Sequence, residues 1–161
     1  MHNFFLATAL FLAALLTGCA STPEFDTTGI DLALTPQSVI AEPDESLGKI
    51  ALWGGTILST LNQEKTTQIE MLAYPLNSSH KPLLDKKPLG RFIIQYKGYL
   101  EPATYEQGEL LTVLGSIGAN QKGKVGESEY TYPVVSARQL HLWTPGDGPK
   151  TSFHLGIGIR L

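Results

Sequence analysis

The stretch GKIALWGGTILSTL, residues 48–61, predicts a long β-strand that bends near its middle. Its apolar residues alternate with a period of two, which is the spacing of side chains on one face of a strand. Gly54 and Gly55 interrupt this alternation, and glycines inside a strand mark a bulge or a sharp bend. A strand that bends in this way can serve both ends of a small closed sheet. One predicted face carries Ile50, Leu52 and Leu58, and the other carries Trp53, Ile57 and Leu61.

Further short strands follow along the chain. After a tight turn at residues 62–65, TTQIEMLAY (66–74) places Ile69, Met71 and Ala73 on one face. Short strands separated by turns that contain Gly and Pro predict an all-β sandwich or barrel. The bent first strand, a meander and a late strand pair favour a small OB-like barrel over residues 47–161. The other predicted strands are RFIIQY (91–96), LLTVLGSIG (110–118), SEYTYPVVSA (128–137), RQLHLW (138–143) and SFHLGIGIRL (152–161), with a turn-rich connection over 118–127.

The chain begins with an apolar run that predicts a secretory signal peptide over residues 1–18. FFLATALFLAALL, residues 4–16, contains no charged side chain. It is shorter than the roughly 20 apolar residues of a membrane-spanning helix, and it ends at small residues, as a signal peptide does. No Lys or Arg precedes it, which departs from the usual basic start of such signals. We expect cleavage between Gly18 and Cys19.

Cys19 is the only cysteine of the chain and follows this run directly. Leu16-Thr17-Gly18-Cys19 matches the bacterial lipobox, in which the cysteine sulfur takes a diacylglycerol and the amino group freed by cleavage is acylated. Several acyl chains on one residue give stable anchoring. Ala20, in place of an aspartate that retains lipoproteins at the inner membrane, favours the outer membrane. We expect a lipid-anchored domain, on the periplasmic face of a Gram-negative outer membrane; an ordinary secretory signal or a buried helix is the alternative.

Residues 19–46 are predicted to form the lipidated N-terminus and an extended tether. STPEFDTTG and TPQSVIAEPDES contain Pro, Ser, Thr and acidic residues and few apolar ones. Such a segment would let the domain stand off the membrane. Some of its apolar side chains could dock on the domain, namely Leu32, Leu34, Val39 and Ile40.

Five motifs, in order and spacing, make the chain similar to one bacterial family, the Slp family of outer-membrane lipoproteins, named for starvation induction. The resemblance implies an envelope lipoprotein linked to stress conditions, with a Slp-type β-barrel domain over residues 47–161 and no defined catalytic residues. The motifs are the lipobox (16–19), LWGGTI (52–57), LGRFIIQYKGYLEPATYEQGELLTVLGSI (89–117), GKVGESEYTYPVV (123–135) and LHLW (140–143).

The sequence lacks the residues that two classes of ligand, nucleotides and nucleic acids, would need for binding. GANQKGKV, residues 118–125, has P-loop spacing, but Val125 stands where Ser or Thr must reach magnesium. The 12 basic and 15 acidic residues leave a net charge of −3, without the basic excess of nucleic-acid-binding proteins. We therefore expect neither nucleotide nor nucleic-acid binding.

The sequence also lacks a catalytic or metal-binding pattern. His80, His141 and His154 lie far apart, without the close spacing of zinc ligands. Glu127 and Glu129 would share a strand face, as a pair of catalytic carboxylates does, but nearby lysines favour a solvated surface. No G-x-S-x-G motif occurs. We expect no enzyme activity, no metal and no cofactor.

Aromatic residues are the best candidates for a recognition face. Trp53, Tyr130, Tyr132 and Trp143 lie in the family-like motifs, and OB-like barrels bind oligomers on an open face. Burial in the core is the alternative, since Trp and Tyr bury large areas. We expect a non-catalytic envelope stress or structural role through binding an envelope component or protein partner. The alternative is a periplasmic module that binds a small molecule or glycan. Nothing in the sequence specifies an oligomeric state.

Overall fold

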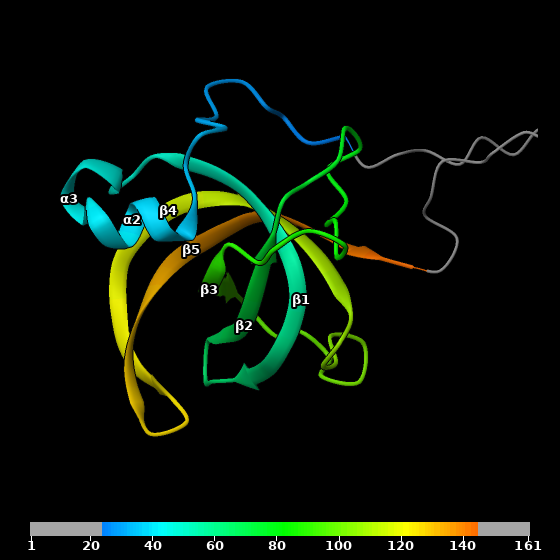
Figure 1. The fold of residues 1–161 in the computed structure, drawn as a ribbon. Helices are drawn as coiled ribbons and strands as arrows, with labels where there is room; N and C mark the ends of the chain where they lie inside the picture. The colour runs from blue at the N-terminus through cyan, green and yellow to red at the C-terminus, as the bar shows by residue number, and fades with distance from the viewer. Residues whose placement is uncertain (1–23, 145–161) are drawn as a thin grey trace, which may run out of the picture.

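The described part of the chain, residues 24–144, forms a closed ring of five strands in the computed structural model (Figure 1). The strands close in the order β1-β2-β3-β5-β4, and β3 and β5 are the one parallel pair among these neighbours. The expected all-β, OB-like barrel is therefore confirmed. The signal peptide, Cys19 and the predicted strand at 152–161 lie outside the described residues. The strands are β1 (Ile50–Asn62), β2 (Thr66–Tyr74), β3 (Gly90–Lys97), β4 (Leu110–Val125) and β5 (Ser128–Trp143).

Strand β1 pairs with β2 and also with β4, the last strand in the order, and this second pairing closes the ring. Residues 50–56 pair with β4, and residues 54–62 pair with β2. At Gly55, a Cβ atom would lie 1.9 Å from the carbonyl oxygen of Leu72, so no side chain fits between the strands there. The prediction that one bent strand serves both ends of the sheet is confirmed.

A bulge in β1 changes which side chains face the interior. The pairing with β2 shifts register between Ile57 and Ser59. Trp53 and Ile57 lie in the core as predicted, but Leu61 is 60% exposed and does not share their face. The prediction for Leu61 was wrong because a bulge reverses the alternation of the residues that follow it.

The barrel interior is filled by aliphatic and aromatic side chains. The ring of Trp53 meets Phe92 edge-on, with 5.2 Å between the ring centroids. The hydroxyl of buried Thr67 donates to the carbonyl of Gly98 and accepts from the N–H of Leu100, which attaches the start of the 98–109 connection to β2. The fully buried side chains include Ile57, Ile69, Met71, Phe92, Ile94, Leu111, Val113 and Val135.

Two short helices, α2 (Pro36–Ala41) and α3 (Pro43–Ser46), lie at one end of the barrel (Figure 1). Thr35 and Ser38 form a capping box that starts α2. Val39 is fully buried and Leu34 is 8% exposed, and both join the barrel core. Their predicted docking is confirmed, whereas Leu32 is 80% exposed. The prediction of an extended tether up to residue 46 was therefore wrong for residues 36–46, which form these two helices. The helices are too short to show helical periodicity in the sequence.

Strands β4 and β5 extend beyond the barrel as a long hairpin (Figure 1). β4 runs without interruption to Val125, where the sequence predicted a turn-rich connection from residue 118, and β5 is one strand rather than two. The part of β4 after residue 118 was not predicted as a strand because its exposed residues are mostly polar and show no apolar alternation. Two register shifts between β4 and β5 further break the pattern.

The close approach at Gly55 predicts a sharp difference between two glycines. We expect Gly55→Ala to lower the free energy of unfolding by about 2 to 3 kcal/mol, because the added methyl group overlaps the backbone of β2. Gly118→Ala is the control, since a Cβ atom there lies 3.8 Å from its nearest neighbour. Urea unfolding of the mature protein, followed by tryptophan fluorescence, measures both; equal losses would contradict the steric explanation.

Candidate functional site

The four aromatic residues that the sequence singled out do not form one face. Trp53 and Trp143 are buried, at 6% and 5% exposure, and Trp53 lies in the main core. Tyr130 and Tyr132 lie together in a smaller apolar cluster with Ile93 and Val134. The structure therefore brings the two tyrosines together and leaves each tryptophan in its own surroundings.

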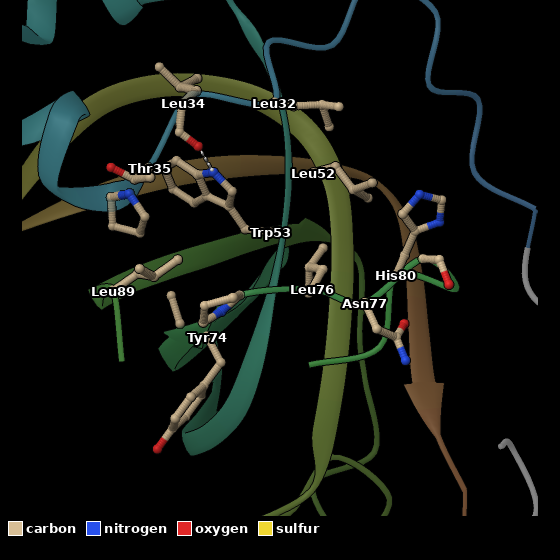
Figure 2. Close-up of a pocket in the computed structure, with 14 residues that line it drawn as sticks. Leu32, Leu34, Thr35, Leu52, Trp53, Tyr74, Leu76, Asn77, His80 and Leu89 are labelled. Atoms are coloured by element: carbon tan, nitrogen blue, oxygen red, sulfur yellow. Dashed lines mark hydrogen bonds between the residues drawn. The ribbon is translucent and has the colours of Figure 1, made fainter. Parts of the chain in front are cut away.

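Each buried tryptophan anchors a loop or segment through its indole N–H. Trp53 Nε1 donates to the carbonyl oxygen of Leu34 at 2.8 Å, which ties the N-terminal segment to β1 (Figure 2). Trp143 Nε1 donates to Thr112 Oγ1 at 2.9 Å, and the Thr112 hydroxyl donates to the carbonyl oxygen of His80 at 2.8 Å. Buried indoles with satisfied N–H groups are typical of a structural role.

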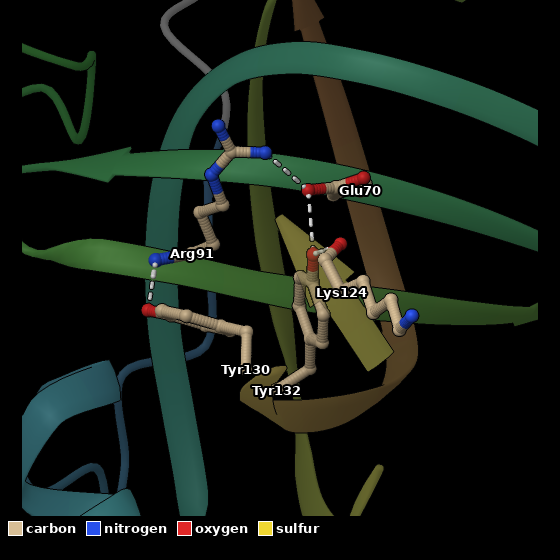
Figure 3. Close-up of polar contacts among 5 residues, drawn as sticks. All are labelled: Glu70, Arg91, Lys124, Tyr130 and Tyr132. Carbon is tan, nitrogen blue, oxygen red and sulfur yellow. Dashed lines mark hydrogen bonds and ion pairs between the residues drawn. The ribbon is translucent and has the colours of Figure 1, made fainter. Parts of the chain in front are cut away.

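The two tyrosines belong to a polar cluster across β2, β3 and the β4–β5 hairpin (Figure 3). We call Glu70, Arg91, Tyr130 and Tyr132 the tyrosine cluster. Arg91 Nη1 donates to Glu70 Oε1 at 2.7 Å, and the Tyr132 hydroxyl lies 3.1 Å from the same oxygen. The Tyr132 hydroxyl also lies 3.1 Å from the carbonyl oxygen of Lys124. The Tyr130 hydroxyl accepts from the Arg91 backbone N–H at 3.0 Å.

The electrostatics of the cluster favour a cationic Arg91 and a neutral Tyr132 phenol. The hydrogen bond to Glu70 raises the pKa of Arg91. Burial raises the pKa of Tyr132, and the negative charge of Glu70 raises it further. The Glu70 carboxylate is thus held as an acceptor between two donors. This arrangement fastens the hairpin to the outer side of β2 and β3, the face that OB-folds commonly use for ligands.

A second feature is a pocket of about 530 Å³ between the N-terminal segment, β1 and the loop that follows β2 (Figure 2). Its wall is largely apolar, with Asn77 and His80 as polar groups near its rim. Trp53 contributes its ring to the wall, while its N–H is already bonded to Leu34. The remaining apolar side chains that line it include Leu32, Leu52, Leu76 and Leu89.

The pocket was not predicted because it joins β1 and the end of β2 to two segments without periodicity, the N-terminal segment and the loop after β2. No strand was predicted between residues 74 and 91, where this loop lies. In the structure, the carbonyl and side-chain oxygens of Asn77 accept backbone N–H groups of the following residues, and His80 adopts a left-handed backbone conformation with φ of 64°. The Asn-Ser-Ser-His order is compatible with such a turn, but it does not indicate which elements pack on it.

The other residues considered for chemistry remain separate in the structure. The ring of His80 meets Phe25, and the ring of His141 meets Trp143, in edge-on contacts; His154 lies outside the described residues. Glu127 and Glu129 are exposed on the hairpin. Within residues 24–144, no three His, Cys, Asp or Glu side chains are grouped so that they could hold a metal ion. Nor does any helix in that range have the length and apolar character to cross a membrane.

The tyrosine cluster predicts an alkaline loss of stability that depends on Tyr132. Its folded-state pKa lies above the ordinary value of 10.0, so its stabilising effect is complete below that pH and is lost as the pH rises through the folded-state pKa. We expect Tyr132→Phe to cost about 1 kcal/mol at neutral pH through the lost hydroxyl, and to lessen the fall of stability at alkaline pH.

Glu70→Gln is the matched variant for this prediction. It should retain most of the alkaline fall, because burial is the larger cause of the raised Tyr132 pKa. Urea unfolding at a series of pH values measures both variants. An alkaline profile of Tyr132→Phe identical to that of the wild type would contradict the assignment.

Comparisons with known proteins agree with the motif resemblance. Residues 16–155 match the model of the outer membrane lipoprotein Slp family. The chain is 34% identical over 143 residues to a protein of Haemophilus influenzae, covering 84% of this chain and 75% of that protein. It is 30% identical over 135 residues to lipoprotein YeaY of Escherichia coli, covering 81% of this chain and 68% of YeaY.

Outer membrane protein Slp of Escherichia coli is 27% identical over 152 residues, covering 92% of this chain and 80% of Slp. Among solved structures, the mitochondrial single-stranded DNA binding protein Rim1 of S. cerevisiae aligns with a TM-score of 0.38 and 18% identity, over 59% of this chain and 94% of that one. The family match spans most of the sequence, from the lipobox to beyond the end of β5. The chain belongs to the outer membrane lipoprotein Slp family.

Proposed function

We propose that this protein is anchored in the outer membrane through lipid on Cys19 and has a non-catalytic role in the cell envelope, where its barrel binds a protein partner or another envelope component. One observation carries the proposal: the family match begins at residue 16 and so includes Leu16-Thr17-Gly18-Cys19. The motif thus lies at the start of the part of the chain that matches a lipoprotein family, which supports a lipid anchor on Cys19.

The proposed anchor follows from the chemistry of one sulfur and one amino group. Cys19 Sγ would take a diacylglyceryl group from a membrane phospholipid: the C–S bond forms, the C–O bond to the headgroup phosphate breaks, and the thiol proton is lost. Hydrolysis of the peptide bond after Gly18 would then free the Cys19 amino group for a further acyl chain. Each buried methylene contributes about 0.8 kcal/mol, and a single acyl chain gives only reversible binding. Three chains on one residue would hold the domain at the membrane permanently, facing the periplasm.

The tyrosine cluster supports a binding role in place of catalysis. Both of its ionised groups are paired with each other, and both phenols are engaged in hydrogen bonds. Its geometry fixes the position of the hairpin on the barrel. A rigid, protruding hairpin with an exposed polar tip is a suitable surface for a protein partner, because little conformational entropy is lost when it binds. We assign this role to envelope stress or structure, as the family resemblance implies.

The anchoring half is tested with Cys19→Ser. The serine hydroxyl cannot form the thioether, so we expect the variant to lose incorporation of radiolabelled palmitate and to move from the outer-membrane fraction to the soluble periplasmic fraction. Ala20→Ser is a matched control beside it and should retain both properties. Labelling and fractionation of Cys19→Ser like those of the wild type would overturn the anchor.

The binding half is tested by cross-linking in cells. A photoreactive residue at Glu127, on the exposed hairpin tip, should give a discrete product with another envelope component in the wild type. Cys19→Ala should reduce that product by removing the protein from the membrane. A photoreactive residue at Lys65, in the short β1–β2 turn, serves as the control position. Products that are equally diffuse at both positions would contradict a specific partner at the hairpin.

The pocket in Figure 2 favours a second candidate, a module that binds a small molecule or glycan. Apolar walls with a few polar groups at the rim are typical of ligand sites. Trp53 forms part of the wall, so its fluorescence would report an occupant. Trp143→Phe removes the second tryptophan signal and leaves Trp53 alone.

Two exposed leucines allow a matched test of this second candidate. Leu32, at 80% exposure, lines the pocket, and Leu61, at 60% exposure, does not. In the Trp143→Phe background, we expect Leu32→Gln to weaken binding of the apolar dye anilinonaphthalene sulfonate about fivefold, which corresponds to about 1 kcal/mol of lost apolar contact. Leu61→Gln should bind like its parent. Equal effects of the two substitutions would contradict dye binding in the pocket.

A further inference from the structure

We infer that the lipid anchor holds one particular end of the barrel against the bilayer, so that the surface around Phe25, Leu32 and His80 faces the lipid headgroups. We call this surface the anchor end. The inference rests on the proposed acylation of Cys19 and adds an orientation to it. The partner is the membrane surface itself.

The chain is already attached to the barrel at Phe25. Phe25 is 5% exposed and lies in an apolar cluster with Leu52 of β1 and Leu114 of β4. Its ring meets His80 edge-on at 5.6 Å between centroids. Just before it, the carbonyl oxygen of Glu24 accepts a hydrogen bond from Gln139 of β5 at 3.0 Å. Residues 24 and 25 are therefore attached to three strands, β1, β4 and β5, and to the loop that carries His80.

Only a short length of chain lies between this attachment and the proposed anchor. Six residue steps separate Cys19 from Phe25. A fully extended chain spans at most about 3.5 Å per residue, so Phe25 lies within about 20 Å of Cys19 in any conformation. If the tether ran freely to residue 46, the same rule would allow roughly 90 Å. The attachment of Phe25 thus removes most of the reach that the sequence suggested.

The hairpin tip lies far from the anchor end. β5 runs sixteen residues from Ser128 beside the tip to Trp143, a contour length of roughly 50 Å at 3.3 Å per residue along a strand that curves with the barrel. Trp143 is linked through Thr112 to the carbonyl of His80, whose ring contacts Phe25. The far end of β5 is thereby fixed at the anchor end, and the strand leads from there to the tip (Figure 1).

The anchor end also has a surface suited to a bilayer. Leu32 is 80% exposed, and it shares the pocket rim with half-buried His80 (Figure 2). The neighbouring Lys81 ammonium lies 5.4 Å from the centroid of the Trp143 ring. An exposed aliphatic side chain beside imidazole and ammonium groups fits the boundary between headgroups and acyl chains. The bilayer would cover this rim, and the hairpin would project into the periplasm.

Fluorescence energy transfer on the full-length lipidated protein tests the orientation. Because Cys19 would be acylated, a cysteine introduced at Leu32→Cys or at Glu127→Cys is the only free thiol for a donor dye. The protein is reconstituted in vesicles of phosphatidylethanolamine and phosphatidylglycerol that contain a headgroup-labelled acceptor. We expect transfer from position 32 to be at least about twofold more efficient than from position 127, given the length of β5.

Adding Phe25→Ala to both labelled proteins should shrink this difference, because the attachment at Phe25 limits the reach of the chain. Adding Leu47→Ala, at a leucine that is 59% exposed, should leave the difference intact. Equal transfer from positions 32 and 127 in protein that floats with the vesicles would overturn the orientation alone. Protein that does not float, with an unmodified Cys19 by mass spectrometry, would overturn both the anchor and the orientation.

Discussion

The contact between the backbones of β1 and β2 at Gly55 is the constraint on which the barrel depends. Every strand of a closed ring pairs with two neighbours, and β1 pairs with β4 through residues 50–56 and with β2 through residues 54–62, so the two pairings overlap at Gly54, Gly55 and Thr56. With no side chain at Gly55, the carbonyl of Leu72 approaches to where a Cβ atom would lie. The close approach leaves Trp53 and Ile57 facing the same interior, where they meet the core residues of the other strands.

The N-terminal segment completes this core instead of merely connecting the domain to a membrane. Val39 of α2 fills one end of the barrel, and the carbonyl of Leu34 satisfies the buried indole N–H of Trp53. Phe25 covers an apolar strip on the outside of β1 and β4. A segment that is partly built into the fold cannot also be a long free tether. Under the proposed lipidation of Cys19, the same short stretch of chain would connect the packing of the core to the position of the barrel at the membrane.

Alternating apolar residues were a reliable guide where one face of a strand is buried. β2 was predicted with its observed bounds, and β3 within one residue at each end. Prediction failed where burial is absent or local. The outer part of β4 is solvent-exposed and polar, so no alternation marks it. The six residues of α2 make fewer than two turns, and a single bulge after Ile57 was enough to turn Leu61 outward.

The candidate sites likewise divide into those that the sequence could predict and those that it could not. Local motifs were sufficient to identify the family and the barrel class and to propose the lipid site at Cys19, because each motif consists of neighbouring residues in the chain. The pairing of Glu70 with Arg91 and Tyr132, and the pocket between Leu32, Trp53 and His80, join segments tens of residues apart. Strand register and loop docking set those distances. Only the folded chain establishes them, because no spacing rule connects residues whose proximity arises from barrel closure.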